Sequence, residues 1–264
     1  MDLGLAGRVA MVAASSKGIG RAIASSLLGE GCRVLICART ADEIDAAREE
    51  MAAAAPITEV FGSRCDVTRT EDLSAWYSAT VERFGKVDIL VTNSGGPPAA
   101  RFFDLTEEKW RDGIDAVLFN VLRLSRLVLP GMRERKWGRI IHVSSFVAKQ
   151  PMELLTISST LRAGLSALTK TMSNEFCKDG VLVNAVLPGH VLTDRQKHLN
   201  EIRSKEEGIP LEAYAARTAA TIPIQRHARP EEIGDVVAFL ASEQASYITG
   251  ATIQVDGGLI QSTF

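Results

Sequence analysis

The stretch RVAMVAASSKGIGRAIASSLLGEG, residues 8–31, decides the fold of this chain. Residues 8–12 end in a run of apolar residues without helical spacing, which is typical of a short buried strand. Gly18 and Gly20 then open an amphipathic helix that we expect to end near Gly31. A glycine turn lets backbone N–H groups approach an anion, and the start of a helix adds partial positive charge at the same place. The stretch therefore predicts a strand, a phosphate-binding turn and a helix.

The composition is that of an ordinary globular protein. The chain has 264 residues, of which 46% are hydrophobic and 23% charged, enough for a substantial core. The formal net charge is −2, and no run of like charges suggests a surface for nucleic acid or membranes. We therefore expect the partners to be small molecules or further copies of the chain.

Targeting and metal-binding signals are not found in the sequence. The N-terminus lacks a basic segment followed by a long apolar one, and charges interrupt every apolar stretch, so we expect a cytoplasmic protein. Cysteines stand at 32, 37, 65 and 177, without the spacing of a metal site or a disulfide framework. They are interpreted as small buried hydrophobes, and no metal is expected.

Strand and helix patterns alternate along the rest of the chain. Short connections between such units imply right-handed crossovers, and therefore a doubly wound parallel sheet of the Rossmann type with ligands at the carboxyl ends of the strands. We expect an α/β fold with seven strands in one domain, residues 1–264. After the first strand, the remaining strands are predicted at 33–38, 58–64, 87–91, 139–143, 181–186 and 251–255.

Three local predictions concern the segments between strands. Thr40 and Glu43 have the spacing of a capping box at the start of a helix. A long helix is predicted over 106–129, apolar on more than one side and broken by Pro130-Gly131. The polar segment 193–223 interrupts the alternation and is predicted to be a helical lid over the crevice.

Several motifs, in order along nearly the whole chain, resemble those of the short-chain dehydrogenase/reductase family, in particular members like 3-oxoacyl-[acyl-carrier-protein] reductase. ASSKGIG at 14–20 is similar to the family's TGxxxGIG loop, with Ala14 in place of the first glycine. Further matches are Cys65-Asp66-Val67, the stretch TNSG at 92–95, the segment from Asn184 through Pro188-Gly189 to Thr193, and the C-terminal residues 248–258.

The resemblance implies a nicotinamide dinucleotide cofactor and hydride transfer to or from a carbonyl or an alcohol. The residues that match the family's cofactor-binding positions are Ala14, Ser16, Lys17, Gly18, Ile19, Gly20, Arg39, Asp66, Val67, Asn93, Ser94, Gly95, Arg162, Pro188, Gly189 and Thr193.

The catalytic positions depart from the family pattern. In the family, a tyrosine and a lysine in YxxxK work with an upstream serine and with an asparagine on the long helix. Ser145 matches the serine, but the tyrosine and lysine positions hold Ser158 and Arg162, and the asparagine position holds Val117. A different register would not restore the pattern, because the tyrosines at 77, 214 and 247 are all remote in sequence.

These replacements leave the proton donor open. Arg162 can still donate to ribose hydroxyls but cannot titrate near neutral pH, and Ser158 is a far weaker acid than a phenol. His190, after Pro188-Gly189, and Tyr214 in the lid segment are candidate substitutes, although a histidine there is more often a pocket-lining residue and a lid tyrosine more often a packing residue. The expected catalytic set is Ser145, Ser158, Arg162 and His190.

Residues near the end of the second strand predict the cofactor. An acidic residue there would bind the ribose 2′-hydroxyl of NAD, but the position holds Ala38. Arg39 and Lys17 can both reach a 2′-phosphate, so we expect NADP to be preferred over NAD. The alternative is that both are solvated surface cations.

The sequence thus predicts an NADP-dependent oxidoreductase acting on a small carbonyl or alcohol substrate through a non-standard active site. The alternative is a weak or inactive NADP-binding homologue that serves as a sensor or structural partner. The helices predicted over 106–129 and 157–176 carry more apolar surface than one sheet face can cover. A homo-oligomer is therefore expected, and by resemblance a tetramer.

Overall fold

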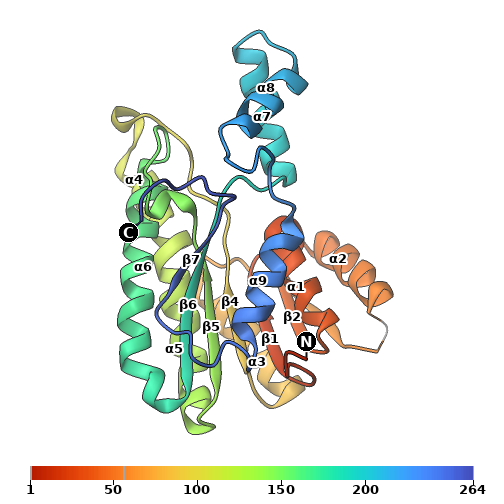
Figure 1. Ribbon diagram of the computed structural model, residues 1–264. Coiled ribbons are helices and arrows are strands. Elements are labelled where there is room, and N and C mark those ends of the chain that lie inside the picture. The colour runs from red at the N-terminus through yellow and green to blue at the C-terminus, as the bar shows by residue number, and fades with distance from the viewer. Residues whose placement is uncertain (1, 56, 264) are drawn as a thin grey trace.

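The computed structural model describes residues 2–55 and 57–263, and its centre is one sheet of seven parallel strands (Figure 1). The strand order β3-β2-β1-β4-β5-β6-β7 confirms the doubly wound prediction. The strands are β1 (Val9–Val12), β2 (Arg33–Ala38), β3 (Val60–Arg64), β4 (Ile89–Thr92), β5 (Gly138–Val143), β6 (Val181–Pro188) and β7 (Thr252–Val255).

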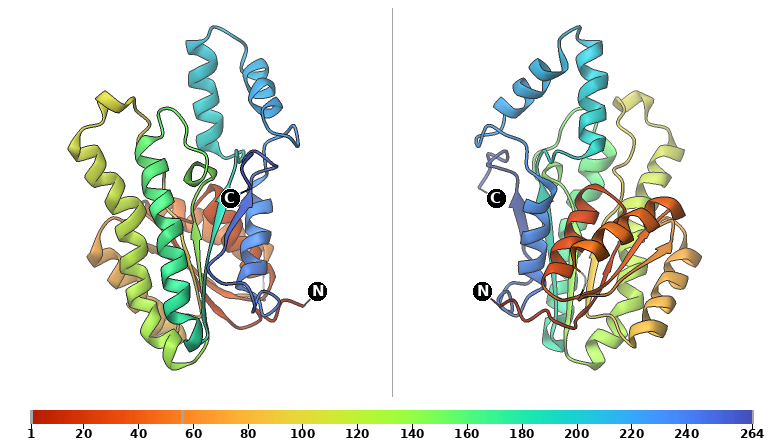
Figure 2. Two further views of the ribbon diagram at one scale, coloured as in Figure 1. Left: turned by 60° about the vertical axis from the view of Figure 1, so that its left-hand side comes forward. Right: turned by 90° about the vertical axis from the view of Figure 1, so that its right-hand side faces the viewer.

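Helices cover both faces of this sheet (Figure 2). One face carries α1 (Gly18–Gly29), α2 (Ala41–Ala54) and α9 (Pro230–Ala241). The other face carries α3 (Thr70–Phe84), α5 (Asn120–Glu134) and α6 (Thr156–Phe176), with α4 (Glu107–Ile114) packed against α6.

Alternate strand residues supply the two cores. Val12 and Ile36 pack on one side with Ile23 of α1, and their neighbours Met11 and Leu35 pack on the other side with α3 and α5. Because both faces are buried in the middle of the sheet, the five inner strands β2, β1, β4, β5 and β6 need apolar residues on both sides. This is why these strands are visible in the sequence as continuous apolar runs.

The long helix over 106–129 differs from the prediction in two ways. It contains a π-helical turn, Asp115–Phe119, between α4 and α5, and Pro130-Gly131 does not break it, since α5 runs on to Glu134. Proline removes one backbone hydrogen bond, but Pro130 is exposed while Val128, Leu129 and Met132 around it are buried. Packing of that apolar face maintains the helix through the proline.

The predicted capping box of Thr40 and Glu43 is also wrong. Thr40 is the N-cap residue of α2, but its side chain makes no capping hydrogen bond. The Glu43 carboxylate instead accepts hydrogen bonds from Ser16 and Lys17 in the glycine turn. Glu43 thus binds the neighbouring glycine turn, although its spacing from Thr40 predicts that it caps its own helix.

The segment predicted as a lid forms two helices, α7 (Asp194–Glu206) and α8 (Leu211–Ala220). They project from the body at the edge where the strands end (Figures 1 and 2). A backbone bridge between Val191 and Ala228 joins the chain entering the pair to the chain leaving it. Within the described part of the chain, none of the helices has both the length and the apolar character needed to span a membrane.

Candidate active site and cofactor-binding loop

The glycine turn after β1 is closely packed. Gly18 has a φ of +58°, in the left-handed region, and a Cβ on Gly20 would stand 2.3 Å from the carbonyl oxygen of Ala14. Ala14 itself has a φ of +47°, which an L-residue with a side chain rarely adopts. Asn93, after β4, donates from Nδ2 to that same Ala14 carbonyl at 3.1 Å. The loops that follow β1 and β4 are therefore joined.

The other residues expected to bind a cofactor lie along the same sheet edge. Thr193 lies beside Gly18, where an added Cβ would be 3.3 Å from the threonine Cγ2. Gly189, after β6, lies against Asp256, whose Cα would be 2.8 Å from a Cβ at position 189. The structure thus brings the loops after β1, β4 and β6 together, as the order of motifs predicts.

The loops after β2 and β3 carry the charged candidates. Arg64 donates from Nε to the carbonyl oxygen of Arg39 at 3.1 Å, which connects the ends of the two strands. Burial tends to raise the pKa of Asp66, but hydrogen bonds from Thr68 and the nearby charge of Arg39 outweigh it and lower that pKa. Asp66 is therefore an anion at neutral pH, held in a turn beside Val67.

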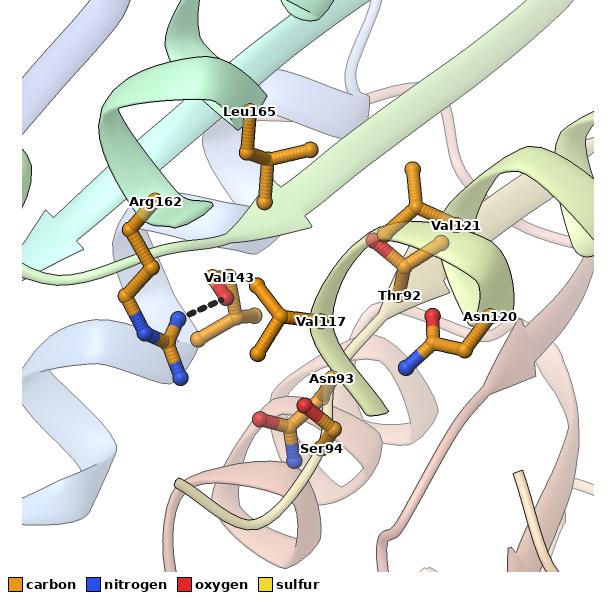
Figure 3. Close-up of a pocket in the computed structure, with 9 residues that line it drawn as sticks. All are labelled: Thr92, Asn93, Ser94, Val117, Asn120, Val121, Val143, Arg162 and Leu165. Atoms are coloured by element: carbon orange, nitrogen blue, oxygen red, sulfur yellow. Dashed lines mark hydrogen bonds between the residues drawn. The ribbon is translucent and has the colours of Figure 1, made fainter. Parts of the chain in front are cut away.

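The replaced catalytic residues lie on α6 and contact each other. Arg162 is 7% exposed and donates from Nε to the hydroxyl oxygen of Ser158 at 3.3 Å. Its Nη1 donates to the carbonyl oxygen of Val143, at the end of β5, at 3.0 Å (Figure 3). Arg162 thereby ties α6 to β5 and holds Ser158 by its oxygen.

Ser145 follows β5 directly. Its hydroxyl accepts a hydrogen bond from the backbone N–H of Val147 at 3.4 Å, at the start of the short 3-10 helix Phe146–Ala148. That short helix packs against α6, the helix that carries Ser158 and Arg162. The structure therefore places all three residues where the carboxyl end of β5 meets α6.

The two candidate substitutes for the tyrosine lie in different surroundings. The ring of His190 is 5.2 Å from the ring of Phe146, the neighbour of Ser145, and 6.2 Å from that of His227. Burial, followed by the charges of His227 and Arg203, lowers the pKa of His190, so its ring is neutral at neutral pH. Tyr214 is 4% exposed on α8. The guanidinium carbon of Arg217, on the same helix, lies 5.0 Å from the centre of the tyrosine ring.

Asn120 is a polar residue of the site that the sequence motifs do not single out. Its backbone N–H bonds to Asp115, five residues back, because of the π-helical turn. The bypassed carbonyl of Ala116 accepts instead from the Asn120 side chain at 2.7 Å. Family spacing assigns the asparagine position to Val117, and the signal that could have revealed Asn120 is a lone amide on an otherwise apolar helix face.

Asn120 and Arg162 both line a small cavity. Its volume is about 10 Å³, close to the size that holds one water molecule. The Oδ1 atom of Asn120 is buried and has no hydrogen-bond partner among the described residues. The lining residues are Thr92, Asn93, Ser94, Val117, Asn120, Val121, Val143, Arg162 and Leu165 (Figure 3).

The cysteines and potential metal ligands are located in the described part of the chain. Cys32, Cys37 and Cys65 are buried free thiols, as expected, but Cys177 is an exposed free thiol, so the interpretation of all four cysteines as buried is wrong at that position. Among the residues that the structure describes, no group of three or more histidine, cysteine or acidic side chains could hold a metal ion.

Comparison with known proteins identifies the family of the chain. Residues 13–260 match the family model described as enoyl-(acyl carrier protein) reductase. The chain is 36% identical over 254 residues to a putative ketoacyl reductase of the monensin polyketide synthase from Streptomyces virginiae, covering 96% of this chain and 97% of that one. The chain belongs to the short-chain dehydrogenase/reductase family.

Two further relatives support this assignment. The 3-oxoacyl-[acyl-carrier-protein] reductase FabG of Vibrio cholerae is 35% identical over 257 residues, covering 97% of this chain and 99% of that one. The crystal structure of L-sorbose reductase from Gluconobacter frateurii, complexed with NADPH and L-sorbose, superposes with a TM-score of 0.95 at 33% identity, covering 99% of this chain and 100% of that one. Members of this family are NAD(P)-dependent oxidoreductases, and this chain has the fold of one.

Proposed function

We propose that this protein is an NADP-dependent oxidoreductase that interconverts a small carbonyl compound and its alcohol through Ser145, Ser158 and Arg162. The observation that carries the proposal is the buried contact between Arg162 and Ser158 at the end of β5. A site that had merely lost its tyrosine and lysine would not need to keep a buried cation bonded to a hydroxyl. Burying an arginine side chain costs desolvation free energy, and hydrogen bonds to the guanidinium are needed to compensate for that cost.

The residues around the glycine turn fit a dinucleotide. Gly20 has no room for a Cβ, and the N-cap residue of α1, Lys17, provides no side-chain cap, so the first N–H groups of this helix can receive a phosphate. Position 38 holds alanine, so no acidic side chain is present there to repel a 2′-phosphate, and the next residue, Arg39, is exposed at the surface. Together with the NADPH complex of the sorbose reductase, these features support NADP over NAD.

When bound, NADP would supply or accept the hydride at its nicotinamide ring. Reduction of a carbonyl leaves negative charge on the substrate oxygen, which needs a donor. Since the oxygen of Ser158 accepts from Arg162, its own proton points away from the guanidinium and can be donated to that charge. Ser145 offers a second hydroxyl. Serine is a poor acid, and a positioned general acid contributes about 10²–10⁴-fold, so we expect slow turnover on ordinary substrates of the family.

Asn120 adds a polar group that the replaced asparagine position lacks. We assign a water molecule to the cavity between Asn120 and Arg162, with the Oδ1 of Asn120 accepting one of its hydrogens. The water would lie beside the guanidinium of Arg162, which lines the same cavity. Asn120 is then a positioning residue for Arg162.

His190 fits the lining of the substrate pocket better than the role of acid. Because the pKa of His190 is lowered, its imidazole is neutral at neutral pH. Only the protonated imidazolium, which forms in acidic solution, could act as a general acid. Tyr214, buried on α8, fits a packing role. The segment 193–223, with α7 and α8 at the sheet edge, is proposed as the lid of a single-domain protein.

Assembly and location remain predictions from sequence. Exposed small residues along α6, Ala163, Gly164 and Ala167, offer a surface on which the helix of a second copy could pack, which supports a homotetramer. Light scattering of the purified protein checks this, and a monomer at micromolar concentration would refute it. A cytoplasmic location is likewise proposed.

The competing function is a cofactor-binding module without efficient chemistry, favoured by the missing tyrosine and lysine. A panel assay separates the two. NADPH oxidation is followed with β-ketoacyl thioesters, cyclic ketones and ketose sugars, and NADP reduction with the corresponding alcohols. The proposed function predicts substrate-dependent turnover with at least one class. Tight NADPH binding without turnover on any member would support the binding module.

A further inference from the structure

Glu43 lies in the first turn of α2 but directs its carboxylate to the glycine turn. Its Oε2 accepts from the hydroxyl of Ser16 at 3.2 Å, and its Oε1 is 3.2 Å from the Nζ of Lys17. Thr40, the residue with which it was expected to form a capping box, makes no side-chain cap. Glu43 therefore interacts with the loop and leaves the end of its own helix uncapped by side chains.

The two donors that hold this carboxylate are ones expected to bind the cofactor. A hydroxyl and an ammonium group that converge on one carboxylate can equally bind a phosphate, since both anions accept charge-assisted hydrogen bonds. The Lys17 side chain is 68% exposed and that of Glu43 is 44% exposed, so both can move when a ligand arrives. The carboxylate thus stands where a 2′-phosphate would find its donors.

We propose that Glu43 is a specificity-determining residue that competes with the 2′-phosphate of NADP for Ser16 and Lys17. This inference rests on the proposed cofactor. Binding of NADP requires the carboxylate to leave both donors or to remain close to a second anion, and either outcome costs affinity. NAD carries a hydroxyl at the same place, and that hydroxyl can donate to the carboxylate. Glu43 therefore narrows the preference for NADP that Ala38, Arg39 and Lys17 create.

The test compares Glu43→Gln with Glu50→Gln. Glu50 is a matched control, because it lies on the same helix, is exposed, and pairs across to α1 through Arg21 at 2.7 Å. Dissociation constants for NADPH and NADH are measured by calorimetry at low salt. Glu43→Gln should bind NADPH about three- to tenfold more tightly, while NADH binding stays equal or weakens. This is the size of effect expected from losing one exposed ion pair that competes for Lys17 and one repulsive charge near the phosphate. Glu50→Gln should change neither constant.

Two results would overturn the inference: equal strengthening of NADPH and NADH binding in Glu43→Gln, or no change in either. Fragments locate the effect, since 2′,5′-ADP carries the 2′-phosphate and 5′-AMP does not. The substitution should favour only 2′,5′-ADP, and should lose its effect when Lys17→Gln is added. Failure of the proposed cofactor gives a different result, because the unmodified protein would then bind NADPH no more tightly than NADH, or would bind neither.

Discussion

The guanidinium Nε of Arg162 donates to the hydroxyl of Ser158 at 3.3 Å, so the residues at the family's lysine and tyrosine positions contact each other. The pair is buried, and a second hydrogen bond from Arg162 fixes it to the end of β5. This contact organises the site that we propose for hydride transfer.

Restoring the family pair should accelerate the reaction. Ser158→Tyr with Arg162→Lys supplies a phenol and an ammonium group that lowers its pKa, and kcat on simple ketones should rise at least about tenfold. Ser158→Phe with Arg162→Lys is the matched control, since it adds the ring without the hydroxyl. Equal rates in the two double variants would mean that the phenol does not reach the substrate, or that the larger ring overpacks the pocket.

Asn120→Leu should impair catalysis more than stability. The substitution removes one hydrogen bond to Ala116 but also a buried oxygen without a protein partner, so the free energy of unfolding should change by no more than about 1 kcal/mol. We expect kcat to fall about tenfold as Arg162 loses its water-mediated support. Ser125→Ala on the same helix, where a buried hydroxyl lies outside the cavity, should leave kcat unchanged. An unaltered kcat in Asn120→Leu would remove Asn120 from the site.

Ala14→Gly should stabilise the protein. Ala14 has a φ of +47°, a conformation in which a Cβ costs about 1–2 kcal/mol. Glycine removes this strain, but it also has more backbone entropy in the unfolded chain, which cancels part of the stabilisation. The expected net effect is a rise of about 0.5–1 kcal/mol in the free energy of unfolding, seen as a Tm higher by about 1–4 °C. Ala13→Gly, at a fully buried neighbour, should lower the Tm. A lower Tm for Ala14→Gly would show that the methyl group is needed for packing.

His142 should make stability depend on pH. Burial lowers its pKa to about 3, against 6.5 for the free side chain. Below pH 6.5 the unfolded chain gains a proton that the folded protein does not bind, so stability falls as the pH drops from 6.5 toward 3. Between pH 7 and pH 5 this one group should remove roughly 2 kcal/mol from the free energy of unfolding. Urea unfolding of His142→Gln should show a correspondingly smaller loss between these pH values, and an identical loss would show that His142 does not titrate on unfolding.

The fold could be predicted from sequence because a parallel sheet covered on both sides demands apolar strands at regular intervals. All seven strands lie within a few residues of their predicted positions. Family spacing also assigns the tyrosine and lysine positions to Ser158 and Arg162. It could not show that they contact each other, because that depends on how the Arg162 side chain reaches back along the helix to Ser158 and across to Val143.

The errors have a common physical origin. The helix through Pro130 and the position of Asn120 depend on long-range packing and on a π-helical turn, neither of which follows from an α-helical period. A capping box is a local pattern and predicts that Glu43 caps its own helix, whereas the observed partners of Glu43 are more than twenty residues away in the sequence. Local rules fail where a side chain finds a charged partner on another element.

The pH dependence of kcat tests the central claim, that the proton donor is not a phenol. The rate of NADPH oxidation is measured with the best substrate of the panel from about pH 7 to pH 10, a range in which neither a serine nor an arginine side chain titrates. The account predicts a rate that stays level over this range. The account would be contradicted if kcat decreased at high pH with a single pKa and this decrease were absent in Tyr214→Phe. That result would identify a tyrosine as the acid.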